Sequence, residues 1–141
     1  MSDILTQLHN GQLLIINSRK RNGLILFKSF HAEFAGPGAA IGGMFDRDCR
    51  DILPVGDLSL LKAANDDERQ KAYRIRRQWI RLTQQITDNP SPAERVKTIL
   101  QQFNNYFETE TVELLPNDAF ALLVGVLPQT VGRIRRTMAR S

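Results

Sequence analysis

Two clusters of basic side chains are the residues whose type and spacing could bind a charged partner. Each cluster lacks acidic residues: Arg69, Lys71, Arg74, Arg76, Arg77 and Arg81 form the first, and Arg133, Arg135, Arg136 and Arg140 the second. Cations gathered in one half of a chain favour a polyanion as partner. The alternative is that each cluster is merely the solvated face of a helix.

Residues for metal or nucleophilic chemistry are few. His9, His31 and the single Cys49 do not have the spacing of a zinc site, and one cysteine cannot form an internal disulfide. Ser18, His31 and Asp46 could be combined into a catalytic triad, but no nucleophile-turn motif accompanies them. We therefore expect no metal, no other cofactor and no enzymatic activity.

The composition is that of one folded domain, or of a small domain with a helical extension. The chain has 141 residues, of which 42% are hydrophobic and 24% charged, with a net charge of +4. No apolar run approaches the roughly 20 residues of a membrane span, and the start lacks the pattern of a signal peptide. We expect a cytoplasmic protein that does not associate with membranes.

The first 64 residues are predicted to form a small β-rich portion. Apolar runs at 13–16 and 24–27 flank a segment that ends in Asn22 and Gly23, a pair that suits tight turns. This pattern predicts a β-hairpin with a basic tip. The tip carries Arg19, Lys20 and Arg21.

A glycine-rich segment follows at residues 35–43, with four glycines and one proline. We predict a turn or a flexible loop there. A phosphate-binding loop is not expected, because no Lys-Ser or Lys-Thr pair follows the glycines.

A long helix is predicted over residues 65–88. Asn65 can cap its start, and three acids in the first turn suit the helix dipole. The apolar residues repeat with the spacing of a coiled-coil seam: Ala72, Ile75, Trp79, Leu82 and Ile86. We predict that this stripe is the seam of a homodimer. The alternative is that it packs on the β portion of its own chain.

Residues 92–141 are predicted to form a helical domain. The prolines at 90 and 92 break the long helix, and a second helix follows. Its apolar residues lie on one side: Val96, Ile99, Leu100, Phe103 and Phe107. Residues 109–115 are predicted to be a short strand or an extended link.

Two short helices that meet at Gly125 complete this domain, in the pattern of a helix-turn-helix. Such a unit needs a small residue where the helices approach, a glycine at the turn and an aliphatic residue inside the second helix. Ala121, Gly125 and Val131 have that spacing. Four more residues complete the inward face: Phe120, Val124, Val126 and Ile134. The alternative is a generic helical hairpin.

These residues resemble the Crp/Fnr transcription regulators. Residues 129–134 are similar to the start of that family's recognition helix, and residues 121–125 to the end of the helix before it. Residues 66–87 lie where the family has its dimerisation helix, and residues 94–100 are similar to the first helix of its DNA-binding domain. The resemblance covers roughly half of the chain.

The chain departs from the family's pattern at several positions. The family has an N-terminal sensor before its dimerisation helix. The part of this chain before the long helix is short, so we expect any such sensor to be abbreviated. Residues 41–43 and Arg50 are similar to the family's cyclic-nucleotide cassette, but Gly43 stands where an acidic ribose ligand is expected. We also expect the β-wing that follows the recognition helix to be absent.

The sequence thus predicts an α+β protein that forms a dimer. The resemblance implies that it binds double-stranded DNA and regulates transcription by placing helix 128–139 in the major groove. Gln129 and Arg133 would then contact base edges. Phosphate contacts are assigned to Thr130, Arg135, Arg136 and Arg140, with auxiliary ones from Arg19, Lys20 and Arg21. The competing expectation is a non-enzymatic interaction protein whose helix-turn-helix docks on another regulator or on the transcription machinery.

Overall fold

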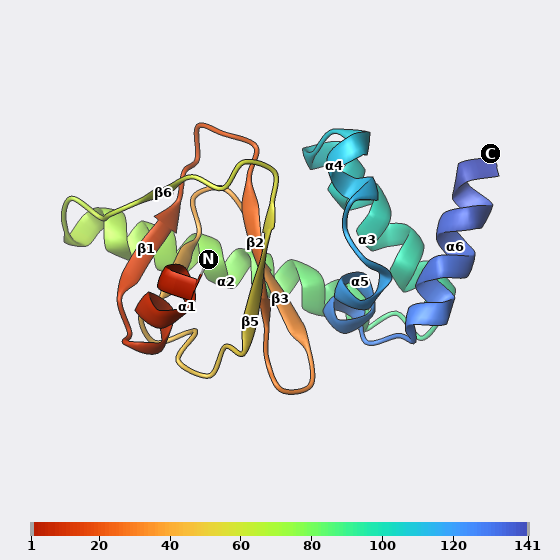
Figure 1. The fold of residues 1–141 in the computed structure, drawn as a ribbon, viewed down its shortest axis with the longest axis horizontal. Helices are drawn as coiled ribbons and strands as arrows, with labels where there is room; N and C mark the ends of the chain where they lie inside the picture. The colour runs from red at the N-terminus through yellow and green to blue at the C-terminus, as the bar shows by residue number, and fades with distance from the viewer. Residues whose placement is uncertain (1, 141) are drawn as a thin grey trace.

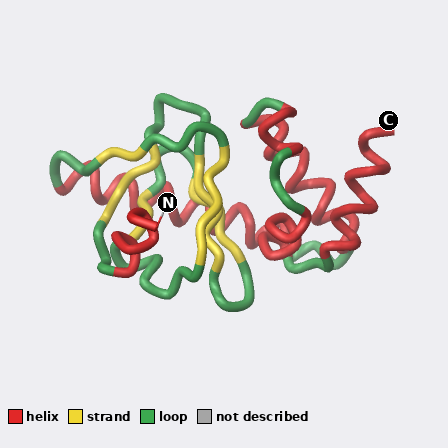
Figure 2. Tube along the Cα trace, viewed as in Figure 1, coloured by secondary structure: helices red, strands yellow, loops and turns green. Residues whose placement is uncertain are grey.

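Within the described residues, short antiparallel strands form two small sheets. The computed structural model describes residues 2–140 and, of the side chains, those of residues 4–139. One sheet has the strand order β4-β1-β6 and the other β3-β2-β5 (Figure 2). The strands are β1 (Leu13–Ile16), β2 (Gly23–Phe27), β3 (Ala32–Ala35), β4 (Ala40–Gly42), β5 (Asp51–Val55) and β6 (Leu60–Leu61).

The predicted hairpin between the first two strands is wrong. β1 pairs with β4 and β6, whereas β2 pairs with β3 and β5, so the two strands lie in different sheets. Neither Asn22 nor Gly23 has the positive φ that a tight hairpin turn requires. Instead, the buried Asn22 amide donates to the carbonyls of Asn17 and Lys20, both at 3.1 Å. Its oxygen accepts a hydrogen bond from the Ser59 N–H, which closes a wider connection between the sheets.

Two other segments differ from the prediction. Residues 109–115 contain the helical turn α4 (Thr109–Glu113) and not a strand. Val112 and Leu115 are three residues apart and both buried in the helical core, a spacing that suits a helix and not an alternating strand. Residues 35–43 include β4 and are largely buried, so they are more ordered than the predicted flexible loop. A first helix, α1 (Ser2–His9), was not predicted.

Four of the predicted helices are confirmed, and capping side chains set the starts of the first two. They are α2 (Asp66–Thr87), α3 (Pro92–Tyr106), α5 (Asn117–Val124) and α6 (Pro128–Arg140). The Asn65 side chain accepts a hydrogen bond from the Glu68 N–H at the start of α2, and Ser91 caps α3 in the same way. With helices and antiparallel strands in separate stretches of chain, the α+β class is confirmed.

The helical part and the β portion share a hydrophobic core. Buried residues of α3, α5 and α6 form one cluster with residues of β2, β3 and β5. A second cluster lies between α1 and the strands, and Trp79 of α2 packs against both clusters. α2 crosses behind the sheets along the long axis and reaches the helical part at its C-terminal end (Figure 1). The C-terminal helices are therefore packed against the rest of the chain.

Candidate nucleic-acid interface

The corner between α5 and α6 has the left-handed glycine and the buried residues that were predicted for a helix-turn-helix. Gly125 follows α5 with φ 68° and ψ 46°, a left-handed conformation that glycine adopts without strain. The Val126 N–H then donates to the Ala121 carbonyl at 3.0 Å, and the chain turns into α6. Of the predicted inward-facing residues, Val126 is partly buried. The others are fully within the core: Phe120, Ala121, Val124, Val131 and Ile134.

Arg95 of α3 holds this corner from the neighbouring helix, a role that the sequence analysis missed. Its Nη1 donates to the Gly125 carbonyl at 3.2 Å, and its Nε donates to the Asn89 carbonyl. Both carbonyls lie just beyond helix ends, where backbone oxygens lack partners within the helix. One guanidinium thereby connects the α5–α6 turn to the link between α2 and α3.

The outward face of α6 presents Gln129, Arg133 and Arg136. Their spacing of four and three residues places them on one side of the helix, and all three are exposed. Val131 and Ile134 are buried on the opposite side. Within the described residues, neither arginine forms an ion pair. Both guanidinium groups are therefore open to an external anion.

Arg135 has a structural role, and its assignment to a DNA phosphate is corrected. Its Nη1 donates to the Leu115 carbonyl at 2.7 Å and to Asn117 Oδ1 at 2.9 Å. Its Nη2 donates to the Val112 carbonyl at 2.9 Å, and its Cζ lies 5.1 Å from the centre of the Phe120 ring. Burial disfavours the charged form and lowers the pKa of Arg135. These contacts tie α6 to the connection between α4 and α5.

The remaining predicted DNA contacts differ in their placement relative to this face. Thr130 is partly buried in the first turn of α6, and the side chain of Arg140 lies outside the described residues. Arg19, Lys20 and Arg21 are exposed, but their loop between β1 and β2 lies over the β portion, whereas α6 stands at the far end of the molecule (Figure 1). The structure does not bring this loop and α6 together.

The basic cluster of α2 divides into outward and inward residues. Arg74, Arg77 and Arg81 are exposed on one face of the helix, and within the described residues they form no ion pair. We call them the arginine stripe. Arg69 pairs with the exposed Asp66 at 3.0 Å. Arg76 is fully buried, so the prediction that the whole cluster faces a polyanion is wrong for this residue.

Arg76 enters the β portion and meets two carboxylates there. Its Nη1 and Nη2 donate to the two carboxylate oxygens of Asp46 at 2.8 and 2.9 Å. Its Nη2 also donates to Glu33 Oε1 at 2.6 Å. Asp46, itself fully buried, accepts a hydrogen bond from the Gly42 N–H at 2.7 Å and lies 3.1 Å from Lys28 Nζ. These ion pairs fasten α2 to the loop after β4 and to β3.

Acid is expected to destabilise the fold through Asp46. Burial opposes ionisation of this carboxyl, but the hydrogen bonds and charge of Arg76, the Gly42 N–H and Lys28 outweigh burial and lower its pKa from the ordinary 3.8. The unfolded chain therefore binds the proton first as pH falls. The stabilisation is fully present above about pH 4 and is lost as pH falls through the lower folded pKa.

Urea unfolding across this acid range measures the effect. As pH is lowered, the free energy of unfolding should fall more steeply in the parent than in Asp46→Asn, which has no carboxyl to titrate at this position. Equal slopes for the two proteins would contradict the assignment.

The apolar stripe of α2 faces its own chain, so the predicted dimer seam is wrong. Ala72 and Ile86 are buried, and Ile75 packs against the core beside α1. Trp79 contacts both cores, and Leu82 lines a narrow gap together with aromatic residues of β3 and α3. The sheets and α3 already cover this side of α2. The side that remains outward carries the arginine stripe, whose like charges oppose self-pairing.

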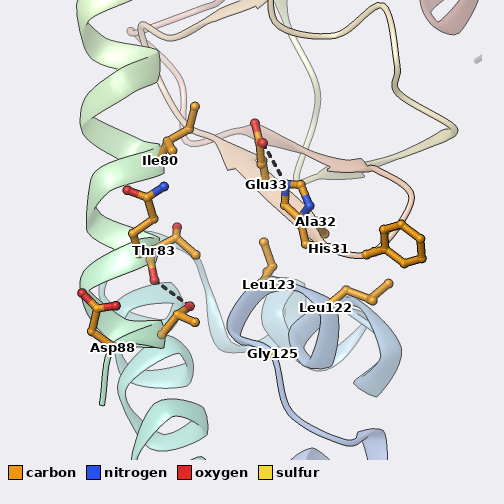
Figure 3. Close-up of a pocket in the computed structure, with 12 residues that line it drawn as sticks. His31, Ala32, Glu33, Ile80, Thr83, Asp88, Leu122, Leu123 and Gly125 are labelled. Carbon is orange, nitrogen blue, oxygen red and sulfur yellow. Dashed lines mark hydrogen bonds and ion pairs between the residues drawn. The ribbon is translucent and has the colours of Figure 1, made fainter. Parts of the chain in front are cut away.

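A cavity of about 280 Å³ lies where α5 meets the β portion (Figure 3). Its walls come from the β2–β3 turn, the C-terminal half of α2, and α5, with Leu122 and Leu123 on the α5 side (Figure 3). Thr83 and Thr87 also line it, but their hydroxyls donate to carbonyls of α2 itself. Phe30 stands at the rim and is 92% exposed. The joint between the two parts is thus partly hollow, with apolar side chains beside the polar His31, Glu33 and Asp88.

The other candidate groups do not form a site. Asp46 is held by Arg76, and His31 Nε2 lies 2.9 Å from Glu33, so the Ser18, His31 and Asp46 combination is not assembled. In the described part of the chain, no three or more His, Cys, Asp or Glu residues group as metal ligands.

Among the helices of residues 2–140, none has both the length and the apolar character needed to cross a membrane.

Comparison with known proteins adds no family. No protein-family model, curated protein or solved structure matches this chain.

Proposed function

We propose that this protein binds double-stranded DNA through α6 and regulates transcription in the cytoplasm. The outward face of α6 carries this proposal, because Gln129, Arg133 and Arg136 are exposed there and the helix contains no acidic residue. α6 stands at one end of the molecule with its length free of the sheets (Figure 1). A helix presented in this way can enter the major groove, which is about 12 Å wide.

The outward residues have different tasks in this pose. Arg133 reads a base edge, since a guanidinium can donate two hydrogen bonds to guanine, and Gln129 pairs in a similar way with adenine. Arg136 and Thr130 contact phosphates, which position the helix without reading sequence. The resemblance of residues 121–134 to the Crp/Fnr helix-turn-helix supports this division.

Substitution of Arg133 and of Arg136 separates base reading from phosphate binding. On a selected duplex, Arg133→Ala should cost about 1–3 kcal/mol while affinity for random duplex changes much less. Arg136→Ala should weaken binding to the selected and to the random duplex alike. It should also reduce by about one unit the slope of log binding constant against log salt concentration. Fluorescence anisotropy with labelled selected and random duplexes, over a salt series, measures both quantities.

Arg74→Ala is the matched control, because it removes one exposed arginine from α2 and none from α6. It should bind both duplexes nearly like the parent. The proposal fails if the parent shows no salt-sensitive DNA affinity, or if Arg133→Ala and Arg136→Ala bind a selected duplex as the parent does. Thermal unfolding of each variant confirms that the fold is retained.

The second candidate is an adaptor whose helix-turn-helix docks on another regulator or on the transcription machinery. Two exposed leucines favour it: Leu127, 68% exposed just before α6, and Leu122, 37% exposed on α5. Apolar side chains at a corner suit a protein partner better than a DNA groove. Two results together would favour this function. The parent captures RNA polymerase or a purified regulator but has no DNA affinity, and Leu127→Ser abolishes that capture.

A further inference from the structure

A cavity lined by three cations lies on the β portion, beside the N-terminal half of α2. This end of α2 is the one away from α6 (Figure 1). The cavity has a volume of about 490 Å³, is open to solvent on one side, and is lined by the β1–β2 loop, the β3–β4 loop, β6 and the N-terminal half of α2. This volume falls in the range of sites that bind small molecules. The cations are Arg19, Lys62 and Lys71.

The charges around this cavity are unbalanced. Within the described residues, the side chains of Arg19, Lys62 and Lys71 form no hydrogen bond or ion pair. The one carboxylate among the described lining residues, Glu68, accepts a hydrogen bond from the Ala64 N–H at 2.9 Å at the start of α2. The cavity is therefore positively charged, and it concentrates anions.

Besides these charged residues and the polar Asn17 and Ser18, the lining contains apolar side chains. Ile15 of β1 and Ala72 and Ile75 of α2 provide these, together with Leu61 of the edge strand β6. Leu61 is 48% exposed, so water contacts apolar surface that an occupant would cover. An apolar wall beside free cations fits a molecule with an anionic group and an apolar body.

We propose that this cavity binds a small amphiphilic anion. Its carboxylate, phosphate or sulfonate group lies between Arg19, Lys62 and Lys71, where charge-assisted hydrogen bonds hold it. Its ring or short chain lies against Ile15 and Ile75. This site is separate from α6, so the proposal does not depend on DNA binding.

Fluorescence titration with anilinonaphthalene sulfonate tests the proposal, with phenylnaphthylamine as the same ring system without the sulfonate. The full-length protein should bind one equivalent of the sulfonate dye, and at least about tenfold more tightly than the uncharged dye. The double variant Lys62→Gln with Lys71→Gln should bind the sulfonate dye at least about tenfold more weakly than the parent.

The double variant Arg74→Gln with Arg77→Gln is the matched control, because it removes the same charge from the arginine stripe. It should bind the sulfonate dye within about twofold of the parent. Equal affinity for the two dyes, or an equal loss in both double variants, would overturn the proposal. Should the first double variant not fold in thermal unfolding, Lys62→Gln alone must still weaken binding of the sulfonate dye.

Discussion

Replacing Asp46 by asparagine is expected to destabilise the fold by about 3–5 kcal/mol, since it leaves buried cations without their partner. Asparagine has nearly the same size but no charge. Arg76, which is fully buried, would lose its bidentate carboxylate, and Lys28 would lose a partner at 3.1 Å. The midpoint of urea unfolding, measured by circular dichroism, should fall accordingly.

Asp48→Asn is the matched control for this change. Asp48 also pairs with Lys28, at 2.7 Å, but its side chain is 72% exposed, so the ion pair is screened by water. Its loss should cost at most about 1 kcal/mol. Comparable costs for the two substitutions would show that burial of Asp46 with Arg76 does not dominate the stability of the β portion.

Trp79→Ala is expected to cost about 3–5 kcal/mol of stability without changing the state of association. The centre of the Trp79 ring lies 5.2 Å from the centre of the Phe34 ring and 5.1 Å from the centre of the Tyr106 ring, and both pairs have edge-to-face geometry. The indole also packs against both hydrophobic cores. Its removal therefore opens the contact between the β portion and the helical part.

Concentration dependence distinguishes this role from a dimer seam. The urea midpoint of Trp79→Ala should be lower than that of the parent, and the shift should be independent of protein concentration. Gln78→Ala, at the exposed neighbouring position on α2, should leave the midpoint nearly unchanged. A parent that sediments as a dimer and a Trp79→Ala variant that sediments as a monomer would contradict the intramolecular packing.

Much of the candidate interface could be predicted from the sequence, because it depends on local features. The left-handed Gly125, the buried Val131 and the outward Arg133 all follow from spacing within a few residues. The role of Arg135 could not be predicted in this way. Its hydrogen-bond acceptors are Val112 and other groups of the α4–α5 connection, whose placement depends on how α4 packs.

The sequence by itself determined α2, α3, α5 and α6 and the cap at Asn65, since turns and capping bonds join residues at most four positions apart. Only the tertiary structure decided strand pairing, the direction of the α2 stripe and the burial of Arg76. Asp46, the partner of Arg76, lies 30 positions away in the chain. An apolar stripe has the same spacing whether it packs on a second copy or on its own sheet, and a basic residue has the same charge whether it meets water or a buried carboxylate. The free energy that separates these outcomes comes from which distant groups the fold brings into contact.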